Sequence, residues 1–480
     1  MTIPQALTEA ARRHAERPAL IGHRVALTHA ELEGCIGRAA ADLEARGVRP
    51  GDLVGVSMAS SPLHLVTILA LARAGACSVH VHPGHPQPVK EALMAQFGVG
   101  AVIGEAETLF PLKADPSWLE PGKAPAHPSR ATSESAWRIS LSSGTTGLQK
   151  AVHYGHAAIL HYLKLHDQVV PMSPDERYLC HRGLDSNLVL NTCLCHLRAG
   201  GAVVFPASLS LAHFIEAIDR NGVTQLAMPP ALLRDLIAQI PSPGVRFPAL
   251  RLVRVAGSSF PLALAEAGLA RISANLAVVY GMAELGFVTI GRSDVLREAP
   301  GSVGRSTPGV EIQVVDPHDA PVPPGTAGIV RLRRAGMPKE YFRNPEATAR
   351  SFRGGWFHTS DVGRLGLDGL LYIDGRVDDK INLEGLKVDP APTERALEEH
   401  PAVVEAAVFA AAPDRGPTAL FAAAVLRAPV DEKLLIAHCR SRVGAMFTPA
   451  RIFFVDKLPR NDAGKVLRAD LSRRVRRPGT

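Results

Sequence analysis

The sequence has few aromatic residues and no closely spaced cysteine pair of the kind that binds zinc. Aromatics make up 5% of the 480 residues, so aliphatic side chains must dominate the hydrophobic cores. The six cysteines include no CxxC pair, which excludes zinc-finger spacing. We therefore expect buried free thiols, including Cys193 and Cys195 within an apolar run, and a reducing compartment.

Long apolar runs, targeting signals and internal repeats are also missing. No stretch approaches about 18 uninterrupted apolar residues, so no membrane-spanning helix is expected. Residues 1–10 lack a basic segment followed by an apolar core, and the final Arg-Arg-Pro-Gly-Thr is no peroxisomal signal. These absences predict a cytoplasmic protein.

The chain has an excess of positive charge without the pattern of a nucleic-acid-binding protein. The formal net charge of +7 suits an anionic substrate such as a nucleotide, or a nucleic acid, or merely scattered surface charge. The one dense basic run includes Arg473, Arg474, Arg476 and Arg477, which we interpret as a solvated end. No recognition motif and no interleaved aromatics accompany the charge, so no nucleic-acid partner is expected.

The order of expected elements indicates an α/β protein with two domains. Strands and helices alternate over 52–82 and 155–279, which is typical of layered parallel α/β structure. Residues 300–375 then predict a β-rich subdomain with Gly and Pro turns, and a compact α+β unit follows. Within the subdomain we expect strands at 310–315, 328–333, 362–366 and 370–373. We predict an N-terminal domain over 1–377 and a C-terminal domain over 378–480.

A segment rich in glycine and hydroxyl groups, residues 140–150, follows an expected strand at 137–139. It has glycines at 144 and 147, five Ser or Thr residues, and Lys150 at its end. Glycines let backbone N–H groups approach an anion, hydroxyls add donors, and lysine binds phosphate well. The spacing is not that of a Walker loop. We interpret the segment as a triphosphate cradle; the alternative is a flexible loop.

Three further segments present one charged residue each in a setting that suits a nucleotide. Glu284 comes after an apolar strand and Tyr280, and it could hold Mg²⁺ or lie on the surface. Asp361 follows Gly-Trp-Phe at 355–357 and could accept hydrogen bonds from two ribose hydroxyls or occupy a turn. Lys465 follows the turn sequence Asn-Asp-Ala-Gly and could act at a loop edge or be a solvated hairpin lysine.

Taken together, the segments resemble the adenylate-forming superfamily of acyl- and aryl-CoA synthetases, luciferases and peptide-synthetase adenylation domains. The resemblance covers essentially the whole chain, and six motifs occur in the order of the family. The motifs are Ser142 to Gly147, Tyr280-Gly281 with Glu284, Gly301 to Gly304 with Arg305, Gly355-Trp356-Phe357 with Asp361, Gly375-Arg376 with Asp378-Asp379, and Pro459-Arg460-Asn461 with Gly464-Lys465.

The resemblance implies a fold and a reaction. The fold would be a large N-terminal domain of layered α/β subdomains and a β-rich subdomain, followed by a small mobile α+β domain. The reaction would join a carboxylic acid to ATP, giving acyl-AMP and pyrophosphate, and then form a thioester with coenzyme A. No nucleophilic side chain is needed, because the substrate carboxylate attacks the α-phosphorus itself. Rotation of the small domain about a hinge at Asp378 would separate the two steps.

The resemblance also implies roles for single residues. Glu284 would be the Mg²⁺ ligand, and Lys465 would bridge the carboxylate and the α-phosphate, which makes these two the catalytic residues. Phosphate binding falls to Ser142, Ser143, Gly144, Thr145, Thr146, Gly147 and Lys150, and AMP binding to Gly257, Ser258, Tyr280, Gly281, Asp361 and Arg376. In the acyl pocket we expect His181 and Met282, although His181 could equally be a core or loop histidine.

Several positions depart from the family pattern, and other functions stay open. Gln149, Ala283, Ser360 and Pro392 replace a common Pro, Thr, Gly and Glu; the lost Thr hydroxyl before Glu284 could slow turnover. One alternative is a ligase that loads an acyl or aminoacyl group onto the phosphopantetheine of a carrier protein. Asp185 invites comparison with the aspartate that binds amino-acid substrates, but it is displaced by about two or three residues. Another alternative is a non-catalytic nucleotide-binding protein, which the intact Lys465 disfavours.

Overall fold

The structure of the chain is a computed structural model. It describes residues 1–84, 87–104, 112–122, 127–141, 150–170, 172–240, 244–258, 260–377, 381–383, 386–411, 419–460 and 464–475. The predicted phosphate-binding residues Ser142 to Gly147 and the predicted hinge residue Asp378 lie outside the described residues. In the described ranges, no helix has both the length and the apolar character needed to cross a membrane.

The chain forms two compact units. Unit 1 comprises residues 1–311 and 333–357, and unit 2 comprises residues 312–332 and 358–480. The β-rich region therefore contributes to both units, because the chain passes from one unit to the other after residues 311, 332 and 357. The domain boundary near residue 378 stays a prediction.

Unit 1 contains a largely parallel sheet with the strand order β6-β5-β3-β4-β7-β8. Its strands are β3 (Leu53–Ser57), β4 (Cys77–His80), β5 (Ala101–Gly104), β6 (Leu112–Lys113), β7 (Ala136–Leu141) and β8 (Ala151–Gly155). Only β7 and β8 pair antiparallel among these described strands. The helices α3 (Pro62–Arg73) and α4 (Gln87–Phe97) connect β3 to β4 and β4 to β5, which confirms the predicted alternation.

A second sheet of unit 1 has the strand order β15-β14-β13-β12-β11-β9-β10-β1-β2. Its strands are β1 (Pro18–Ile21), β2 (Ala26–Thr28), β9 (Arg177–Leu179), β10 (Ala202–Val204), β11 (Gln225–Met228), β12 (Leu252–Ala256), β13 (Leu276–Met282), β14 (Gly286–Gly291) and β15 (Ser302–Ser306). The strands from β1 to β13 in this order pair parallel, so their carboxyl ends share one edge. Apolar residues of α7 (Leu211–Asn221), α8 (Pro230–Gln239) and α9 (Leu262–Arg271) form a core against these strands.

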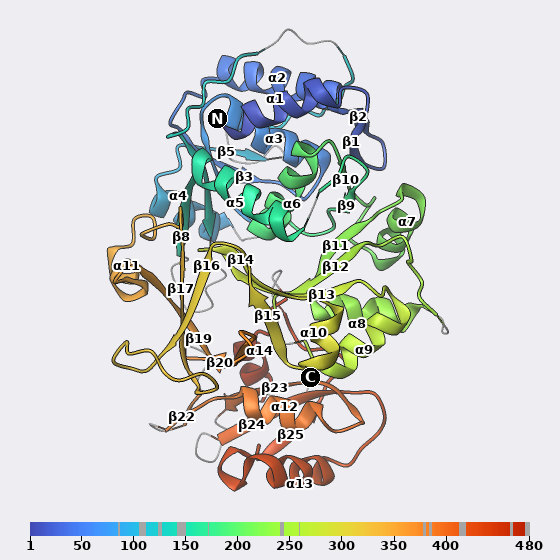
Figure 1. The fold of residues 1–480 in the computed structure, drawn as a ribbon, viewed down its shortest axis with the longest axis vertical. Helices are drawn as coiled ribbons and strands as arrows, with labels where there is room; N and C mark the ends of the chain where they lie inside the picture. The colour runs from blue at the N-terminus through green and yellow to red at the C-terminus, as the bar shows by residue number, and fades with distance from the viewer. Residues whose placement is uncertain are drawn as a thin grey trace. The chain divides into compact units, whose positions relative to one another are not determined.

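Further helices of unit 1 pack together beside the sheets. They are α1 (Ile3–Arg13), α2 (His29–Ala45), α5 (His156–Val169) and α6 (Asn187–Arg198), with the short α10 (Ser293–Glu298) and α11 (Pro345–Ser351) elsewhere. Figure 1 shows α5 and α6 side by side, and α1 contacts both α2 and α6. Thr28 caps α2, since its hydroxyl accepts a hydrogen bond from the backbone N–H of Glu31 in a capping box.

The β-rich part of unit 2 has the strand order β16-β17-β19-β20. These strands are β16 (Val310–Val315), β17 (Gly328–Arg334), β19 (Trp356–Leu365) and β20 (Leu371–Arg376), and the short β18 (Phe352–Arg353) also pairs with β19. The predicted strand at 362–366 was too short, because β19 already begins at Trp356. Its pairing with β20 extends back to Asp361, and its pairing with β18 reaches Trp356.

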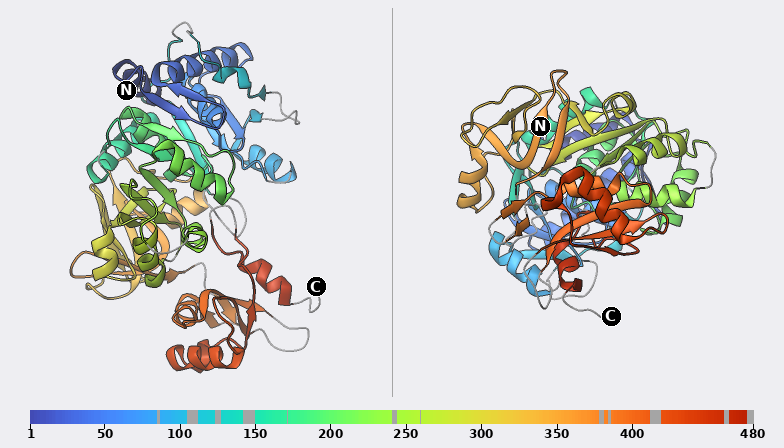
Figure 2. Two further views of the ribbon diagram at one scale, coloured as in Figure 1. Left: turned by 90° about the vertical axis from the view of Figure 1, so that its right-hand side faces the viewer. Right: turned by 90° about the horizontal axis from the view of Figure 1, so that it is seen from below.

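The C-terminal part of unit 2 is a three-stranded sheet covered on both faces (Figure 2). It consists of β23 (Val403–Ala411), β24 (Ala419–Leu426) and β25 (Arg451–Phe454), with the helices α12 (Ala391–Glu398), α13 (Glu432–Val443) and α14 (Arg468–Val475) and the small hairpin β21 (Ile381–Leu383) and β22 (Leu386–Val388). One face of the sheet packs against α12 and α13, and the opposite face packs against Leu471 of α14. This is the predicted α+β unit.

All six cysteines are buried and free, as predicted. Burial raises the pKa of Cys77 and Cys195 to about 12, so both stay protonated thiols near neutral pH. They are residues of the core and not reactive groups.

Candidate active site

Lys150 stands at the boundary of the predicted phosphate segment. The strands β7 and β8 pair antiparallel up to Leu141 and Ala151, so the segment connects two hydrogen-bonded neighbours of the sheet. The Nζ atom of Lys150 lies 5.2 Å from the ring centroid of Tyr341, a cation–π distance. The positive charge predicted for this segment is therefore held at one place on an aromatic face.

Tyr341 joins Lys150 to the predicted metal ligand. Its hydroxyl donates a hydrogen bond of 2.6 Å to Oε1 of Glu284, and both side chains are buried, with 3% and 7% exposed. The backbone N–H of the next residue, Phe342, donates to the carbonyl of Ala151 at 2.7 Å, so the segment is tied to β8. Sequence reasoning missed Tyr341, which is 57 positions from Glu284; its only signal was a tyrosine close before the capping residue Asn344.

A tight strand connection fixes Glu284. The sequence suggested that β13 ends before Tyr280, but β13 continues to Met282 and pairs antiparallel with β14, with Met282 opposite Gly286. A Cβ atom at Gly281 would lie 2.4 Å from the Gly286 carbonyl oxygen, so only glycine allows this approach.

The carbonyl oxygen of Ala283 anchors the same turn. It accepts hydrogen bonds from the hydroxyl of Tyr154 and, at 3.3 Å, from Nδ2 of Asn187. Burial raises the pKa of Tyr154 well above its ordinary value, so this donor keeps its proton. The backbone around Glu284 is thus held by β8 and α6, although Ala283 lacks the hydroxyl common in the family.

Three of the residues predicted to bind AMP lie at one sheet edge. Ala256 and Val279 are register partners on the parallel strands β12 and β13, so Gly257 and Ser258, which follow β12, lie at the same edge as Tyr280 of β13. Gly257 adopts φ of 104°, a conformation that favours glycine. Ligands of parallel α/β sheets bind beyond the carboxyl ends of the strands, and this edge has that position.

Within unit 2, Asp361 and Arg376 form an ion pair across β19 and β20. They are direct register partners, and Nη1 of Arg376 donates to Oδ1 of Asp361 at 3.0 Å. The backbone N–H of Asp361 also donates to Oγ1 of Thr359 at 3.0 Å. The side chain of Asp361 is 9% exposed and that of Arg376 is 42% exposed. Two residues predicted to serve AMP are therefore neighbours, in strands and not in a turn.

Lys465 follows a loop closed by a bridge between Arg460 and Val466. Nη1 of Arg460 donates to the Gly464 carbonyl at 2.7 Å, and its Nη2 pairs with Glu405 of β23. Gly464 has φ of 80°. These contacts explain why the motif has arginine at 460 and glycine at 464: both residues hold the backbone next to Lys465 in place. Lys465 itself is half-buried.

His181 lies in a core environment. Its ring packs edge-on against Phe214 of α7 at a centroid distance of 4.9 Å, and burial lowers the pKa of His181 to about 3. The histidine is therefore neutral near pH 7. Nearby in sequence, Oδ2 of Asp185 lies 3.8 Å from Nε2 of His80, and its carbonyl accepts from the buried Arg138 at 2.6 Å. The acyl-pocket roles of His181 and Met282 stay predictions.

One group outside this site has the residue types of a metal centre. Ligand atoms of His166, Asp167 and Cys195 lie within 4.8 Å of one another. However, Nη1 of Arg254 donates to Nε2 of His166 at 3.2 Å, which leaves the proton on Nδ1, the atom facing Cys195 at 3.4 Å. Asp167 is paired with Arg198. A protonated Nδ1 and an ion-paired carboxylate do not suit a cation, so Glu284 is the better candidate.

Comparison with known proteins identifies the class of protein. Residues 7–342 match the family described as AMP-binding enzyme, and residues 393–465 match the AMP-binding enzyme C-terminal domain. The chain therefore belongs to the AMP-binding enzyme family. The predicted resemblance to adenylate-forming enzymes is confirmed, and so is the predicted fold class, with a large N-terminal and a smaller C-terminal part.

Particular relatives cover nearly the whole chain. Feruloyl-CoA synthase of an Amycolatopsis species is 29% identical over 471 residues, which is 94% of each chain. A fatty acid–[acyl-carrier-protein] ligase of Streptomyces coeruleorubidus is 28% identical over 98% of this chain and 96% of its own. The structure of o-succinylbenzoate CoA synthetase of Bacillus subtilis, solved with its acyl-adenylate intermediate, has a TM-score of 0.86 at 25% identity over 98% of both chains.

Proposed function

We propose that this enzyme uses ATP to activate a carboxylic acid as acyl-AMP and then transfers the acyl group to coenzyme A. The observation that supports this best is the group formed by Lys150, Tyr341 and Glu284 beside the predicted phosphate segment. It combines a cation for phosphate oxygens with a buried, oriented carboxylate for a metal ion. The family membership and the relatives that are CoA synthases support the same reaction.

Charge neutralisation is the first task, because the acid and ATP are both anions. The carboxylate oxygens of Glu284 fit Mg²⁺, which prefers carboxylate and phosphate oxygens as ligands. The ion would supply positive charge to the phosphates. Tyr341 and the anchored Ala283 carbonyl keep the carboxylate in one orientation. Lys150 adds a fixed cation on the ring of Tyr341. A related Bacillus subtilis synthetase has been solved in complex with ATP and a magnesium ion.

The remaining roles follow the predicted assignments. Asp361 would accept the ribose hydroxyls, and Arg376 holds its carboxylate in place through the hydrogen bond of 3.0 Å. Lys465 would contact the reacting carboxylate and the α-phosphate, where charge changes most during the attack. Since no side chain acts as the nucleophile, these groups act by position and charge.

The experiment is pyrophosphate release from ATP with a panel of aryl, short-chain, long-chain and amino acids, each with and without coenzyme A. We expect release with one class of acid, increased by coenzyme A, together with the corresponding acyl-CoA. Glu284→Gln serves as the variant that should lose release while retaining the fold. Absence of release with every acid, from a folded protein, would contradict the proposed function.

A second candidate acceptor is a carrier-protein thiol. The Streptomyces coeruleorubidus relative that is named as an acyl-carrier-protein ligase favours it. Pyrophosphate release that coenzyme A leaves unchanged, followed by acylation of a phosphopantetheinylated carrier protein, would support this acceptor. Formation of acyl-CoA at a comparable rate to adenylation would exclude it.

A further inference from the structure

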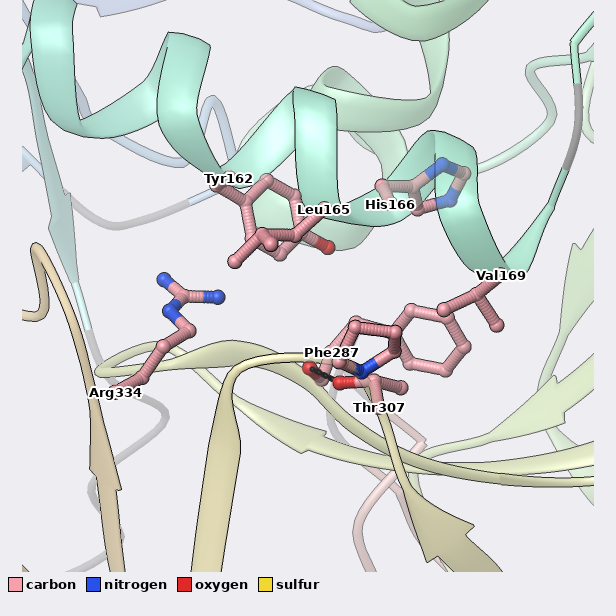
Figure 3. Close-up of a pocket in the computed structure, with 8 residues that line it drawn as sticks. Tyr162, Leu165, His166, Val169, Phe287, Thr307 and Arg334 are labelled. Atoms are coloured by element: carbon pink, nitrogen blue, oxygen red, sulfur yellow. Dashed lines mark hydrogen bonds between the residues drawn. The ribbon is translucent and has the colours of Figure 1, made fainter.

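A small pocket of unit 1 is lined by none of the residues assigned to catalysis. It is formed by the C-terminal half of α5, by Phe287 of β14, by Thr307 and by Arg334 at the end of β17 (Figure 3). Its volume is about 10 Å³, which is space for one water molecule or one monatomic ion. No organic acid, nucleotide or pantetheine chain fits a space of this size.

Arg334 is a buried cation that lines this pocket. Its residue exposure is 6%, and its guanidinium group lies 4.9 Å from the ring centroid of Tyr162. Its Nε atom is buried without a hydrogen-bond partner. Burial lowers the pKa of Arg334, and only the tyrosines 162 and 154 oppose that shift. Within the described ranges, no carboxylate pairs with Arg334.

A second buried cation adds to the positive charge behind the pocket. Arg254 is fully buried, and its two hydrogen bonds of 3.2 Å go to neutral acceptors, Nε2 of His166 and Oγ1 of Thr192. His166, which lines the pocket, is itself neutral because burial and Arg254 lower its pKa well below the ordinary value. The carboxylate of Asp167, next along α5, is already paired with Arg198.

A buried charge without a counter-ion is strongly unfavourable, because the group loses its hydration and gains no interaction with an opposite charge in return. Thr307, a further polar side chain at the pocket, does not supply that compensation. The hydroxyl of Thr307 donates to the Phe287 carbonyl at 3.1 Å, as Figure 3 shows. Within the part of the chain that the structure describes, no side chain serves as the counter-ion of Arg334, so an ion from solution is the partner to test.

We propose that the Arg334 pocket binds one small monovalent inorganic anion of halide size. The guanidinium group would provide the charge and the hydrogen-bond donors, and the aromatic and aliphatic walls would favour a weakly hydrated ion such as chloride or bromide. The bound anion stabilises unit 1 by compensating a charge for which the described residues supply no counter-ion. None of the pocket's lining residues is assigned to the binding of ATP, so this proposal does not depend on the proposed reaction.

Thermal unfolding in chloride and in gluconate at equal ionic strength tests this proposal, since gluconate is too large for the pocket. We expect the melting temperature of the wild-type protein to be about 2 °C higher in chloride, by linkage of a bound ligand to the folded state. Arg334→Met should abolish the difference. The control Arg350→Met, which alters an exposed arginine paired with Glu346, should retain it. Equal melting in both salts, or a difference that survives Arg334→Met, would overturn the proposal.

A measurement on the wild-type protein guards against a variant that fails to fold. Crystals soaked in bromide should show an anomalous peak beside the guanidinium group of Arg334. A peak there establishes the anion. Density without anomalous signal at this position identifies a water molecule only and refutes the proposal.

Discussion

Replacing Tyr341 with phenylalanine tests the central contact of the candidate active site. The change removes one hydroxyl and keeps the aromatic ring, so the cation–π contact with Lys150 at 5.2 Å should persist. What is lost is the 2.6 Å hydrogen bond to Oε1 of Glu284, within a pair that is almost completely buried. The variant therefore isolates the orientation of the carboxylate.

The expected magnitude follows from the burial and the charge. A hydrogen bond to an ionised group contributes about 1.5–3 kcal/mol, and little water can replace the donor at a carboxylate that is 7% exposed. If the full amount is realised in the adenylation transition state, the rate falls by about 10- to 150-fold. The apparent affinity for Mg²⁺ should fall as well, because the ligand is no longer held in one orientation.

The assay is pyrophosphate release at increasing Mg²⁺ concentration, compared with Tyr372→Phe as the matched control. Tyr372 lies in unit 2, where its ring packs under Arg364 at 4.2 Å, so its variant should behave like the wild type. A Tyr341→Phe enzyme with the wild-type rate and the wild-type Mg²⁺ dependence would refute the proposed role of Glu284 and of its hydrogen bond in adenylation.

Three further predictions use other parts of the chain. Lys465→Ala should lower adenylation by about 10²–10³ in single-turnover assays, whereas the exposed Lys457→Ala should not; equal effects would remove the special role of Lys465. Asp378→Pro should spare adenylation and impair thioester formation, and equal loss in both half-reactions would argue against a hinge there. Burial lowers the pKa of His64 to about 3. Below about pH 6.5 this histidine is therefore protonated in the unfolded chain but not in the folded chain, so the stability of the fold decreases as the pH drops. In chemical denaturation between pH 7.5 and 5.5, the free energy of unfolding of His64→Gln should therefore fall by about 1.4 kcal/mol less than that of the wild type. The variant His23→Gln, at an exposed histidine, should match the wild type. Equal decreases for the wild type and His64→Gln would contradict this reasoning.

Local patterns in the sequence were sufficient for the family, the fold class and most elements. The alternation of strands and helices and the burial of the cysteines depend on neighbouring residues and on hydropathy, and both are confirmed. Errors occurred where hydrogen bonding between strands decided the outcome. The strand β13 passes the expected end because β14 pairs with it, and Asp361 lies in β19 because β18 and β20 extend that strand.

The sequence by itself determined which chemical groups are present: a segment rich in glycine and hydroxyl groups, Glu284, Asp361 with Arg376, and Lys465. Only the tertiary structure decided which side chains touch them. Tyr341 reaches Glu284 across 57 positions, and Arg334 ends in a pocket where the described residues provide no counter-ion. Such contacts depend on strand register and on packing between distant segments, which local periodicity does not encode.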